Sequence, residues 1–285
     1  MEKRSLKITL VVDNTAEDAL LCEHGFAAWI ELGGQKILFD TGQGAALLPN
    51  CERLGIDLAQ ASALVLSHGH YDHTGKLPEF LACNPRATLF FGPGFRKTRF
   101  SCHPGQAARD ISVGDAVRAA LKALPEARCT EVTAHRYLYP GVGLSGPIPR
   151  LVPFEDCGGP FFLDAEKHEA DLLDDELALW FETTDGLLIL TGCCHAGLLN
   201  TIDHVGQVSG RSRIHGIIGG LHLMNASAQR LDQTCRSLAD CAPDFVVPCH
   251  CTGEQAAQRL MQELGEQMVC PGRAGQVFTA EMATI

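Results

Sequence analysis

Apolar residues in this chain fall into short runs rich in β-branched side chains, and these runs predict strands. The predicted strands cover residues 6–12, 27–32, 35–39, 61–66, 87–91, 177–182, 187–191, 214–218 and 245–248. Stretches with helical spacing predict helices over residues 45–54, 74–83, 116–124, 197–208, 226–238 and 253–264. Two groups of strands with helices among them favour an α/β fold of four layers, αββα, although the periodicity also fits a doubly wound sheet.

The segment 92–150 departs from this regular pattern. Apart from the helix predicted at 116–124, it is interrupted by Gly-Pro-Gly, Tyr-Pro-Gly and Gly-Pro-Ile-Pro-Arg. Loops this long in compact domains are usually functional. A chain of 285 residues is long enough for one large domain or two small ones. We expect a single domain over residues 1–285, in which residues 92–150 form an insert or lid.

The densest group of metal-binding side chains directly follows the predicted strand 61–66. It places His68, His70, Asp72 and His73 within six positions. Alternate side chains of an extended chain share a face, so His68 and His70 can point at one ion. Once the chain turns into a helix, Asp72 and His73 project in new directions and can serve a second ion. The spacing predicts two neighbouring metal ions in preference to a histidine-rich turn with solvated or core-bonded imidazoles.

Two further histidines occupy the same setting, the carboxyl end of an apolar strand. They are His195 after the strand 187–191 and His250 after the strand 245–248. Active sites of α/β folds collect at these strand ends, so we predict both as completing ligands; the alternative is a core histidine bonded to the backbone. His222, in Gly-Gly-Leu-His-Leu, is interpreted as a pocket residue that contacts substrate, with a purely structural role left open.

The composition limits the kinds of partner that the protein is expected to bind. A formal net charge of −11 argues against a nucleic-acid surface, yet is compatible with a small cationic pocket for a small anionic substrate. The 13 cysteines lack the framework of a secreted domain, which indicates reduced thiols, and we predict packing roles for Cys194, Cys249 and Cys251. No segment approaches the ~20 apolar residues of a membrane span, and no signal peptide follows the basic N-terminus. We expect a cytoplasmic protein without membrane association, and no oligomeric state is predicted.

The His-x-His-x-Asp-His signature between a buried strand and a helix resembles that of the metallo-β-lactamase-fold hydrolases. The resemblance implies an αββα sandwich with two divalent ions at one edge, zinc first, with iron, manganese or nickel as alternatives. It also implies a distribution of ligands in which the first metal takes His68 and His70, and the second takes Asp72, His73 and His250. Asp40, in Phe-Asp-Thr-Gly, matches an early family aspartate that supports the ligands.

The middle of the chain departs from the common family pattern. Where many members have a Gly-His-Thr ligand and a bridging aspartate in Gly-Asp, this chain has Gly146-Pro147 and Gly192-Cys193. His195 is the expected substitute, and whether Cys193 also touches a metal stays open. This departure and several further segments resemble the branch of the 7,8-dihydropterin-6-methyl-4-(β-D-ribofuranosyl)aminobenzene 5′-phosphate synthases. Those segments add candidates for substrate contact or ligand support, namely Glu23, His24, Arg150 and Cys193.

We therefore predict a metal-dependent hydrolase or transferase. The resemblance favours a pterin-like substrate whose pyrophosphate is displaced by an arylamine; the alternative is hydrolysis of an ester, lactone or phosphodiester. Asp72 is the predicted proton carrier, His222 a donor to developing charge, and Arg150 either a phosphate contact or a solvated loop arginine. A non-catalytic metal-bound sensor, whose cysteines report oxidation, is the hypothesis from another class. RNA processing is disfavoured by the acidic charge balance.

Overall fold

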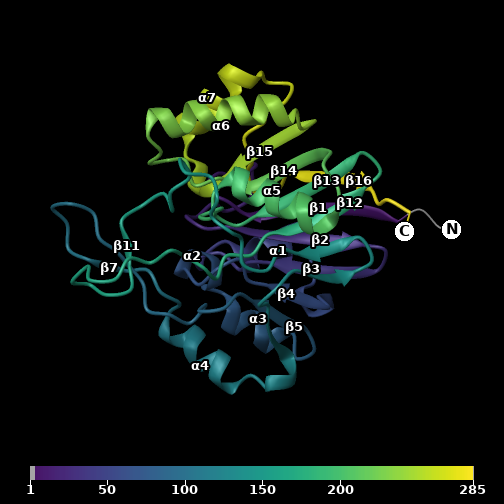
Figure 1. The fold of residues 1–285 in the computed structure, drawn as a ribbon. Coiled ribbons are helices and arrows are strands. Elements are labelled where there is room, and N and C mark those ends of the chain that lie inside the picture. Colours follow the sequence, from purple (N-terminus) through teal and green to yellow (C-terminus); the bar gives the residue numbers. More distant parts are fainter. Residues whose placement is uncertain (1–3, 285) are drawn as a thin grey trace.

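The strands of the protein form two large sheets that face each other, as a computed structural model of residues 4–284 shows (Figure 1). The order of strands in the first sheet is β16 (Val277–Glu281), β1 (Ser5–Val12), β2 (Ala27–Leu32), β3 (Gln35–Phe39), β4 (Ala63–Val65), β5 (Thr88–Phe91) and β8 (Cys129–Glu131). The order in the second is β15 (Phe245–Cys249), β14 (Ile214–Gly220), β13 (Gly186–Thr191), β12 (Leu179–Thr183), β10 (Val142–Leu144) and β9 (Arg136–Tyr139).

Helices cover the outer faces of both sheets, which gives four layers. The central core joins side chains of both sheets, such as Ile8 and Phe39 from the first and Leu188 and Ile218 from the second. The outer face of the first sheet packs against α1 (Leu47–Leu54), α3 (Leu77–Cys83) and α4 (Asp115–Ala123). The outer face of the second packs against α5 (Leu198–Ser209), α6 (Ala228–Cys241) and α7 (Glu254–Leu264). The αββα prediction is confirmed, and the doubly wound alternative is wrong.

Most predicted elements form, and the exceptions have local causes. The helix predicted over 74–83 begins later, as α3 at Leu77 with Pro78 in its first turn, where a missing amide proton costs no helical hydrogen bond; α2 (Tyr71–Thr74) is a separate turn before it. The unpredicted strand β16 pairs with β1 at the edge of the first sheet, where its side chains alternate between exposed and partly buried. Three short 3-10 turns complete the helices: η1 (Leu58–Gln60), η2 (Glu126–Arg128) and η3 (His250–Thr252).

Glycine geometry fixes the first hairpin. Leu32 pairs with Gln35, so Gly33 and Gly34 alone form the turn between β2 and β3. Their φ angles are 51° and 86°, a left-handed conformation that side chains rarely adopt. This Gly-Gly turn sets β3 in the register that delivers Asp40 to the sheet edge.

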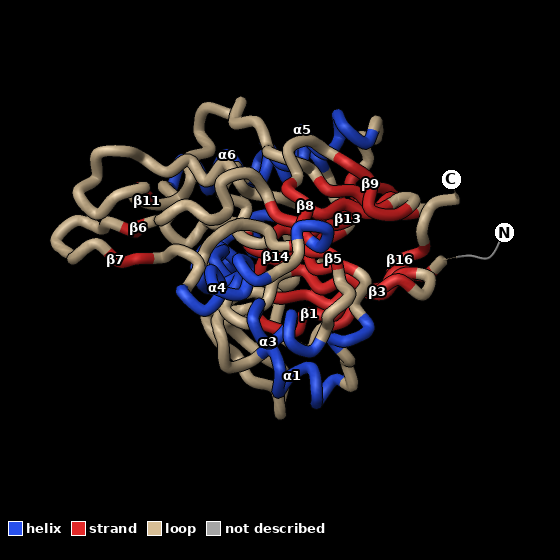
Figure 2. Tube along the Cα trace, turned by 90° about the horizontal axis from the view of Figure 1, so that it is seen from below, coloured by secondary structure: helices blue, strands red, loops and turns tan. Residues whose placement is uncertain are grey.

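A third, small sheet projects from one end of the sandwich (Figures 1 and 2). It contains β11 (Phe161–Phe162), β6 (Phe100–Ser101) and β7 (Arg109–Asp110). Arg99, which precedes β6 and is fully buried, pairs at 2.9 Å with Asp171 and at 2.7 Å with Asp175. This ion network ties the projecting sheet, hereafter the flap, to the loop before β12. Within residues 92–150, the strands β8, β9 and β10 belong to the sandwich, whereas β6 and β7 belong to the flap.

Across residues 4–284, none of the helices combines the length and the apolar character that crossing a bilayer requires.

Candidate metal centre

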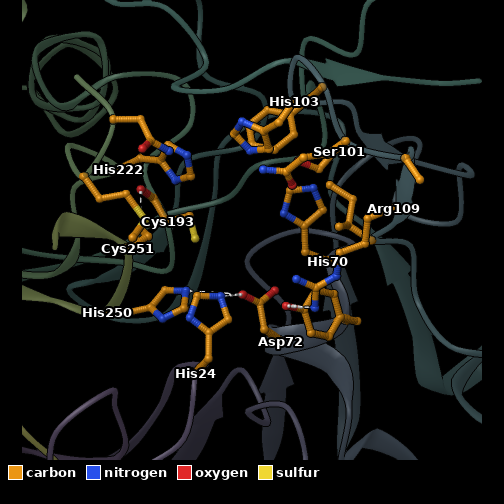
Figure 3. A pocket seen from close by; sticks show the side chains of 17 residues that line it. His24, His70, Asp72, Ser101, His103, Arg109, Cys193, His222, His250 and Cys251 are labelled. Carbon is orange, nitrogen blue, oxygen red and sulfur yellow. Dashed lines mark hydrogen bonds and ion pairs between the residues drawn. The ribbon is translucent and has the colours of Figure 1, made fainter. Parts of the chain in front are cut away.

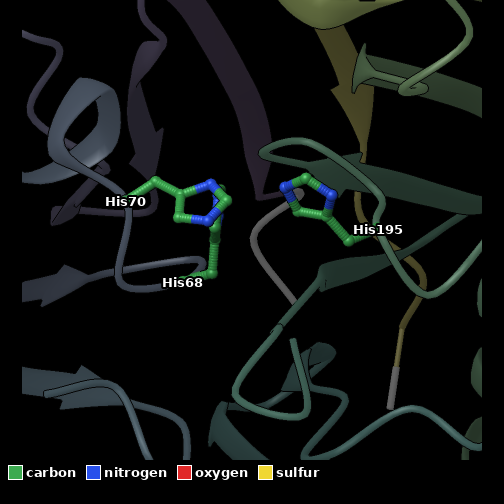
Figure 4. A group of neighbouring side chains, drawn as sticks. All are labelled: His68, His70 and His195. Atoms are coloured by element: carbon green, nitrogen blue, oxygen red, sulfur yellow. The ribbon is translucent and has the colours of Figure 1, made fainter. Parts of the chain in front are cut away.

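The His68–His73 segment lies at the carboxyl end of β4 and runs into α2. His68 and His73 have no exposed surface, and His70 and Asp72 are 5% and 6% exposed. His195, which follows β13 in the opposite sheet, points toward His68 and His70 (Figure 4). One ring nitrogen from each of these three histidines lies within 4.8 Å of the others. The two sheets therefore bring together candidate ligands separated by more than a hundred residues.

This first group, His68, His70 and His195, has the properties of a metal site. Nε2 of His70 and Nε2 of His195 are buried and have no hydrogen-bond partner. Burial lowers the pKa of all three imidazoles well below 6.5, which favours the neutral ring, the form that binds a metal ion. A buried ring nitrogen without a partner is costly, and a divalent cation would satisfy both. The residues fit the metal that the motif implies.

A second group lies beside the first and contains His24, Asp72 and His250 (Figure 3). Asp72 Oδ2 is 3.0 Å from His24 Nε2 and 3.4 Å from His250 Nε2, whereas Asp72 Oδ1 is buried without a partner. Burial opposes ionisation of Asp72, but the neighbouring histidines outweigh it and hold the pKa of this carboxyl well below 3.8. The group thus offers a carboxylate and two imidazoles to a cation.

Asp40 orients the ligands of the first sheet from behind. Its Oδ1 accepts a hydrogen bond from the Ser67 amide at 2.7 Å, and its Oδ2 contacts Ser67 Oγ and His73 Nδ1, both at 2.7 Å. Burial lowers the pKa of His73, but the carboxylates of Asp40 and Asp72 outweigh it and raise this pKa to about 9. Because Nδ1 is used by Asp40, only Nε2 of His73 faces the centre.

Residues from distant segments orient the ligands of the second sheet. His250 Nδ1 lies 2.9 Å from Asn14 Oδ1, and its backbone amide donates to Asp13 at 2.7 Å. His195 Nδ1 lies 3.1 Å from the Cys157 carbonyl, and its amide donates to Glu176 at 2.6 Å. Burial raises the pKa of both supporting carboxyls, Asp13 and Glu176, to about 7. Each ligand histidine is thus fixed at the ring and at the backbone.

Strained backbone accumulates at the centre. Asp40, Cys194, His222 and His250 have φ angles of 57°, 63°, 46° and 45°, a region that non-glycine residues avoid. Each such residue costs about 1–3 kcal/mol and persists only where surrounding contacts enforce it. Such strain is typical of functional sites, and here it falls at or beside the ends of the strands that deliver the ligands.

Both groups open into one pocket of about 430 Å³ (Figure 3). His70, Asp72, Cys193 and His250 lie at its base, and His222 lines one wall. The His222 ring centroid is 4.1 Å from that of His195, and its Nδ1 is buried without a partner. The flap supplies the outer wall through residues that sequence reasoning missed, namely Ser101, His103, Gln106, Arg109 and Phe161.

Two predicted candidates for substrate contact lie outside this pocket lining. Glu23 accepts hydrogen bonds from the backbone amides of residues 43–46 ahead of α1. Arg150 donates to the carbonyl oxygens of His195 and Leu172. Both side chains therefore hold backbone near the centre. Asp13, Asn14 and Glu176 were not predicted as site residues, because their partners are backbone groups and ring nitrogens far away in the sequence.

The chain is similar to known proteins in sequence and in fold. The sequence model of the metallo-beta-lactamase superfamily matches residues 21–82, which include the whole His68–His73 motif. Over 257 residues the chain is 28% identical to the 7,8-dihydropterin-6-methyl-4-(beta-D-ribofuranosyl)-aminobenzene-5'-phosphate synthase of Methanocaldococcus jannaschii, covering 86% of each chain. An uncharacterized protein of the same archaeon is 29% identical over 256 residues, which cover 90% of this chain and 94% of the other.

Solved structures show the same fold. Tm1679, described as a metal-dependent hydrolase of the beta-lactamase superfamily, superposes with a TM-score of 0.80 at 25% identity, covering 96% of this chain and 98% of that one. Zinc-bound PqqB from Methylobacterium extorquens superposes with a TM-score of 0.58 at 11% identity, covering 95% and 99%. The resemblance inferred from the motif is confirmed. The chain thus has the metallo-beta-lactamase fold, and it is similar to proteins named as a synthase and as a metal-dependent hydrolase.

Proposed function

We propose that this protein is a dinuclear metalloenzyme that displaces pyrophosphate from a small dihydropterin-like substrate in favour of an arylamine. The observation that carries the proposal is the shared pocket: His70 from the first group and Asp72 and His250 from the second all line it. Two ions held there would face one bound molecule. The name of the archaeal synthase, whose similarity extends over 86% of the chain, supports the choice of substrate class.

The ligands divide between the two ions by position. One ion would take His68, His70 and His195, which form the first group. The other would take Asp72 and His250 of the second group together with His73, whose ring centroid is 5.1 Å from that of His250, and His24 would support Asp72. When bound, the ions would act as Lewis acids that stabilise the negative charge developing on phosphate oxygens. Asp40 fixes His73 through Nδ1, and Asn14 fixes His250 in the same way, so their Nε2 atoms are pre-oriented.

Arg109 is suited to bind the anionic end of the substrate. Among the described residues that line the pocket, it is the one arginine, and there is no lysine. Its guanidinium lies 5.0 Å from the centroid of the Tyr71 ring and donates to the Tyr71 hydroxyl at 2.8 Å, which leaves further donors available. Arg150, in contrast, already uses its guanidinium on backbone carbonyls. We therefore assign the phosphate contact to Arg109.

The remaining pocket residues suit a displacement at carbon. The arylamine nitrogen forms a bond to the methylene carbon while the bond from that carbon to the pyrophosphate oxygen breaks, and the electron pair leaves with pyrophosphate. Asp72 Oδ1, buried and unpartnered, would accept the amine proton, and His222 Nδ1 would donate to the departing anion. Phe161 provides an aromatic surface at the pocket wall for a flat ring.

Hydrolysis is the second candidate, and the similarity to Tm1679 favours it. The same ligands and the same anion contact would serve hydrolysis of an ester, lactone or phosphodiester. The two activities differ in whether water or an amine reaches the reacting atom. An assay that identifies substrates and products therefore distinguishes hydrolysis from transfer.

A two-substrate assay tests the proposal. The zinc-loaded protein is incubated with 6-hydroxymethyl-7,8-dihydropterin pyrophosphate, with and without 4-(β-D-ribofuranosyl)aminobenzene 5′-phosphate, and pyrophosphate and the pterin product are measured. We expect release that requires the amine and yields one coupled product per pyrophosphate. Release of pyrophosphate without the amine would show that the protein hydrolyses this substrate and does not transfer the pterin to the amine. Absence of release, together with cleavage of phosphodiesters or lactones in parallel assays, would reject the pterin substrate.

A further inference from the structure

One sulfur atom lies between the two ligand groups. Cys193 Sγ is within 4.8 Å of potential ligand atoms in three separate clusters, which contain, besides Cys193, the pairs His68 and His73, His195 and His222, and His250 and Cys251. The sulfur therefore adjoins ligands assigned to the first ion and ligands assigned to the second. In Figure 3 its side chain projects into the space between His222 and His250.

The backbone holds this sulfur in place. Cys193 follows β13, and its side chain is 3% exposed. Its Sγ lies 3.1 Å from His73 Nε2, the nitrogen that faces the centre. At the preceding Gly192, a Cβ would lie 2.2 Å from Ser67 Oγ and 2.9 Å from Asp40 Oδ2. The chain before Cys193 is thus packed directly on the residues that orient the first-sheet ligands.

Neighbouring cysteines are placed differently. Cys251 Sγ donates to the Cys193 carbonyl at 3.4 Å, so Cys251 lies beside Cys193 on the side of the second sheet. Cys194 Sγ instead contacts Thr201 Oγ1 of α5 at 3.5 Å and belongs to the outer core of that sheet. Because Cys193 and Cys194 are adjacent in the sequence but have different surroundings, a variant of Cys194 is a matched control for variants of Cys193.

We propose that Cys193 binds both metal ions as a bridging thiolate. The inference rests on the dinuclear centre of the proposed function and extends it, because a thiolate at this position selects thiophilic ions such as zinc, iron(II) and cobalt(II) over magnesium and manganese. Binding replaces the S–H bond by two sulfur–metal bonds, and the thiol proton passes to solvent. Cys251 supports Cys193 through its hydrogen bond to the Cys193 carbonyl.

Cobalt(II) substitution tests this assignment without reference to turnover. Thiolate ligands give cobalt(II) an intense near-ultraviolet charge-transfer band, whereas nitrogen and oxygen ligands do not. The full-length protein and the variants Cys193→Ser, Cys193→Asp and Cys194→Ala are loaded with cobalt, and the spectrum and cobalt content of each are measured. We expect the band in the wild type and in Cys194→Ala, and its loss in both Cys193 variants.

The Cys193→Asp variant separates loss of a ligand from loss of the fold, because aspartate can still bridge. We expect it to bind two cobalt ions per chain with no thiolate band. Two bound ions without the band in the wild type would overturn the bridging thiolate and leave the dinuclear proposal intact. Retention of the band in Cys193→Ser would also overturn it and would make Cys251 the ligand. A wild type that binds only one ion would contradict the dinuclear proposal itself.

Discussion

The two halves of the centre are built in different ways. The half from the first sheet is mostly local in sequence: its candidate ligands lie between His68 and His73, next to Ser67. Asp40, 33 positions before His73, fixes them from the end of the neighbouring strand β3. The half from the second sheet is assembled from separate strand ends. There, the amide of His250 donates to Asp13, which lies 237 positions away in the sequence.

This difference has a physical origin. A strand that passes directly into a helix can offer several ligands from one short segment, because the two geometries send side chains in different directions. The second sheet offers only one or two side chains at each strand end, so each ligand needs support from another part of the chain. Cys157, Glu176 and Asn14 supply that support. The first half therefore needs only two neighbouring strand ends of one sheet, whereas the second depends on the assembled sandwich.

Removing one ligand from each half has the largest expected effect. We expect His70→Ala and His195→Ala each to abolish turnover and to lower metal content by at least one ion per chain, because the two Nε2 atoms belong to the same group. Metal content by mass spectrometry and turnover in the amine-dependent assay measure this. His168→Ala, at a histidine whose side chain is 80% exposed, is the matched control. Full metal content in either ligand variant would contradict the assignment for that half.

The next largest effect on metal affinity is expected from the carboxylates that support the ligands, and its size should differ between the two halves. Asp40→Asn keeps a residue that tolerates φ 57° but replaces one of the two oxygens that hold Ser67 and His73, so we expect metal affinity to fall about 10- to 100-fold. In Asp13→Asn one oxygen is enough to accept from the His250 amide, so we expect a smaller loss. Competition with a chromogenic chelator measures both affinities. Equal losses would refute the proposed contrast between the halves.

The same contrast explains what the sequence could predict. The alternation of apolar runs and the His68–His73 motif depend on local geometry, so the strands, the helices and the candidate ligands of the first sheet are readable from short segments. The choice of αββα layers over a doubly wound sheet needed the resemblance carried by the motif. His195 and His250 were readable as histidines at strand ends. The flap could not be predicted from the sequence, because β6, β7 and β11 are strands of only two residues. Their pairing depends on tertiary contacts, including those of the buried Arg99. Arg109 was missed for that reason.

Arg109 lies outside both halves, so its removal should weaken substrate binding and leave the metal content unchanged. We expect Arg109→Ala to weaken binding of inorganic pyrophosphate by the zinc-loaded protein about tenfold, in line with loss of one hydrogen bond between charged groups. Titration calorimetry measures the binding, and metal analysis should find the full zinc content. Arg118→Ala on α4, where the side chain bonds the Arg96 carbonyl, is the control. Unchanged pyrophosphate affinity would remove Arg109 from the anion site.

The smallest expected effect concerns Glu23, which lies near the first half without entering the pocket lining. Its carboxylate accepts from four successive amides at residues 43–46, like a cap ahead of α1. Glu23→Gln retains one acceptor oxygen, so we expect the free energy of unfolding to fall by about 1 kcal/mol, with metal content unchanged. Denaturant unfolding measures the loss, and Glu52→Gln on exposed α1 surface is the control. Loss of metal in Glu23→Gln would show that the first half extends beyond its local segment, because the turn at residues 42–44 also packs against Gly25 beside the Asp72 carbonyl.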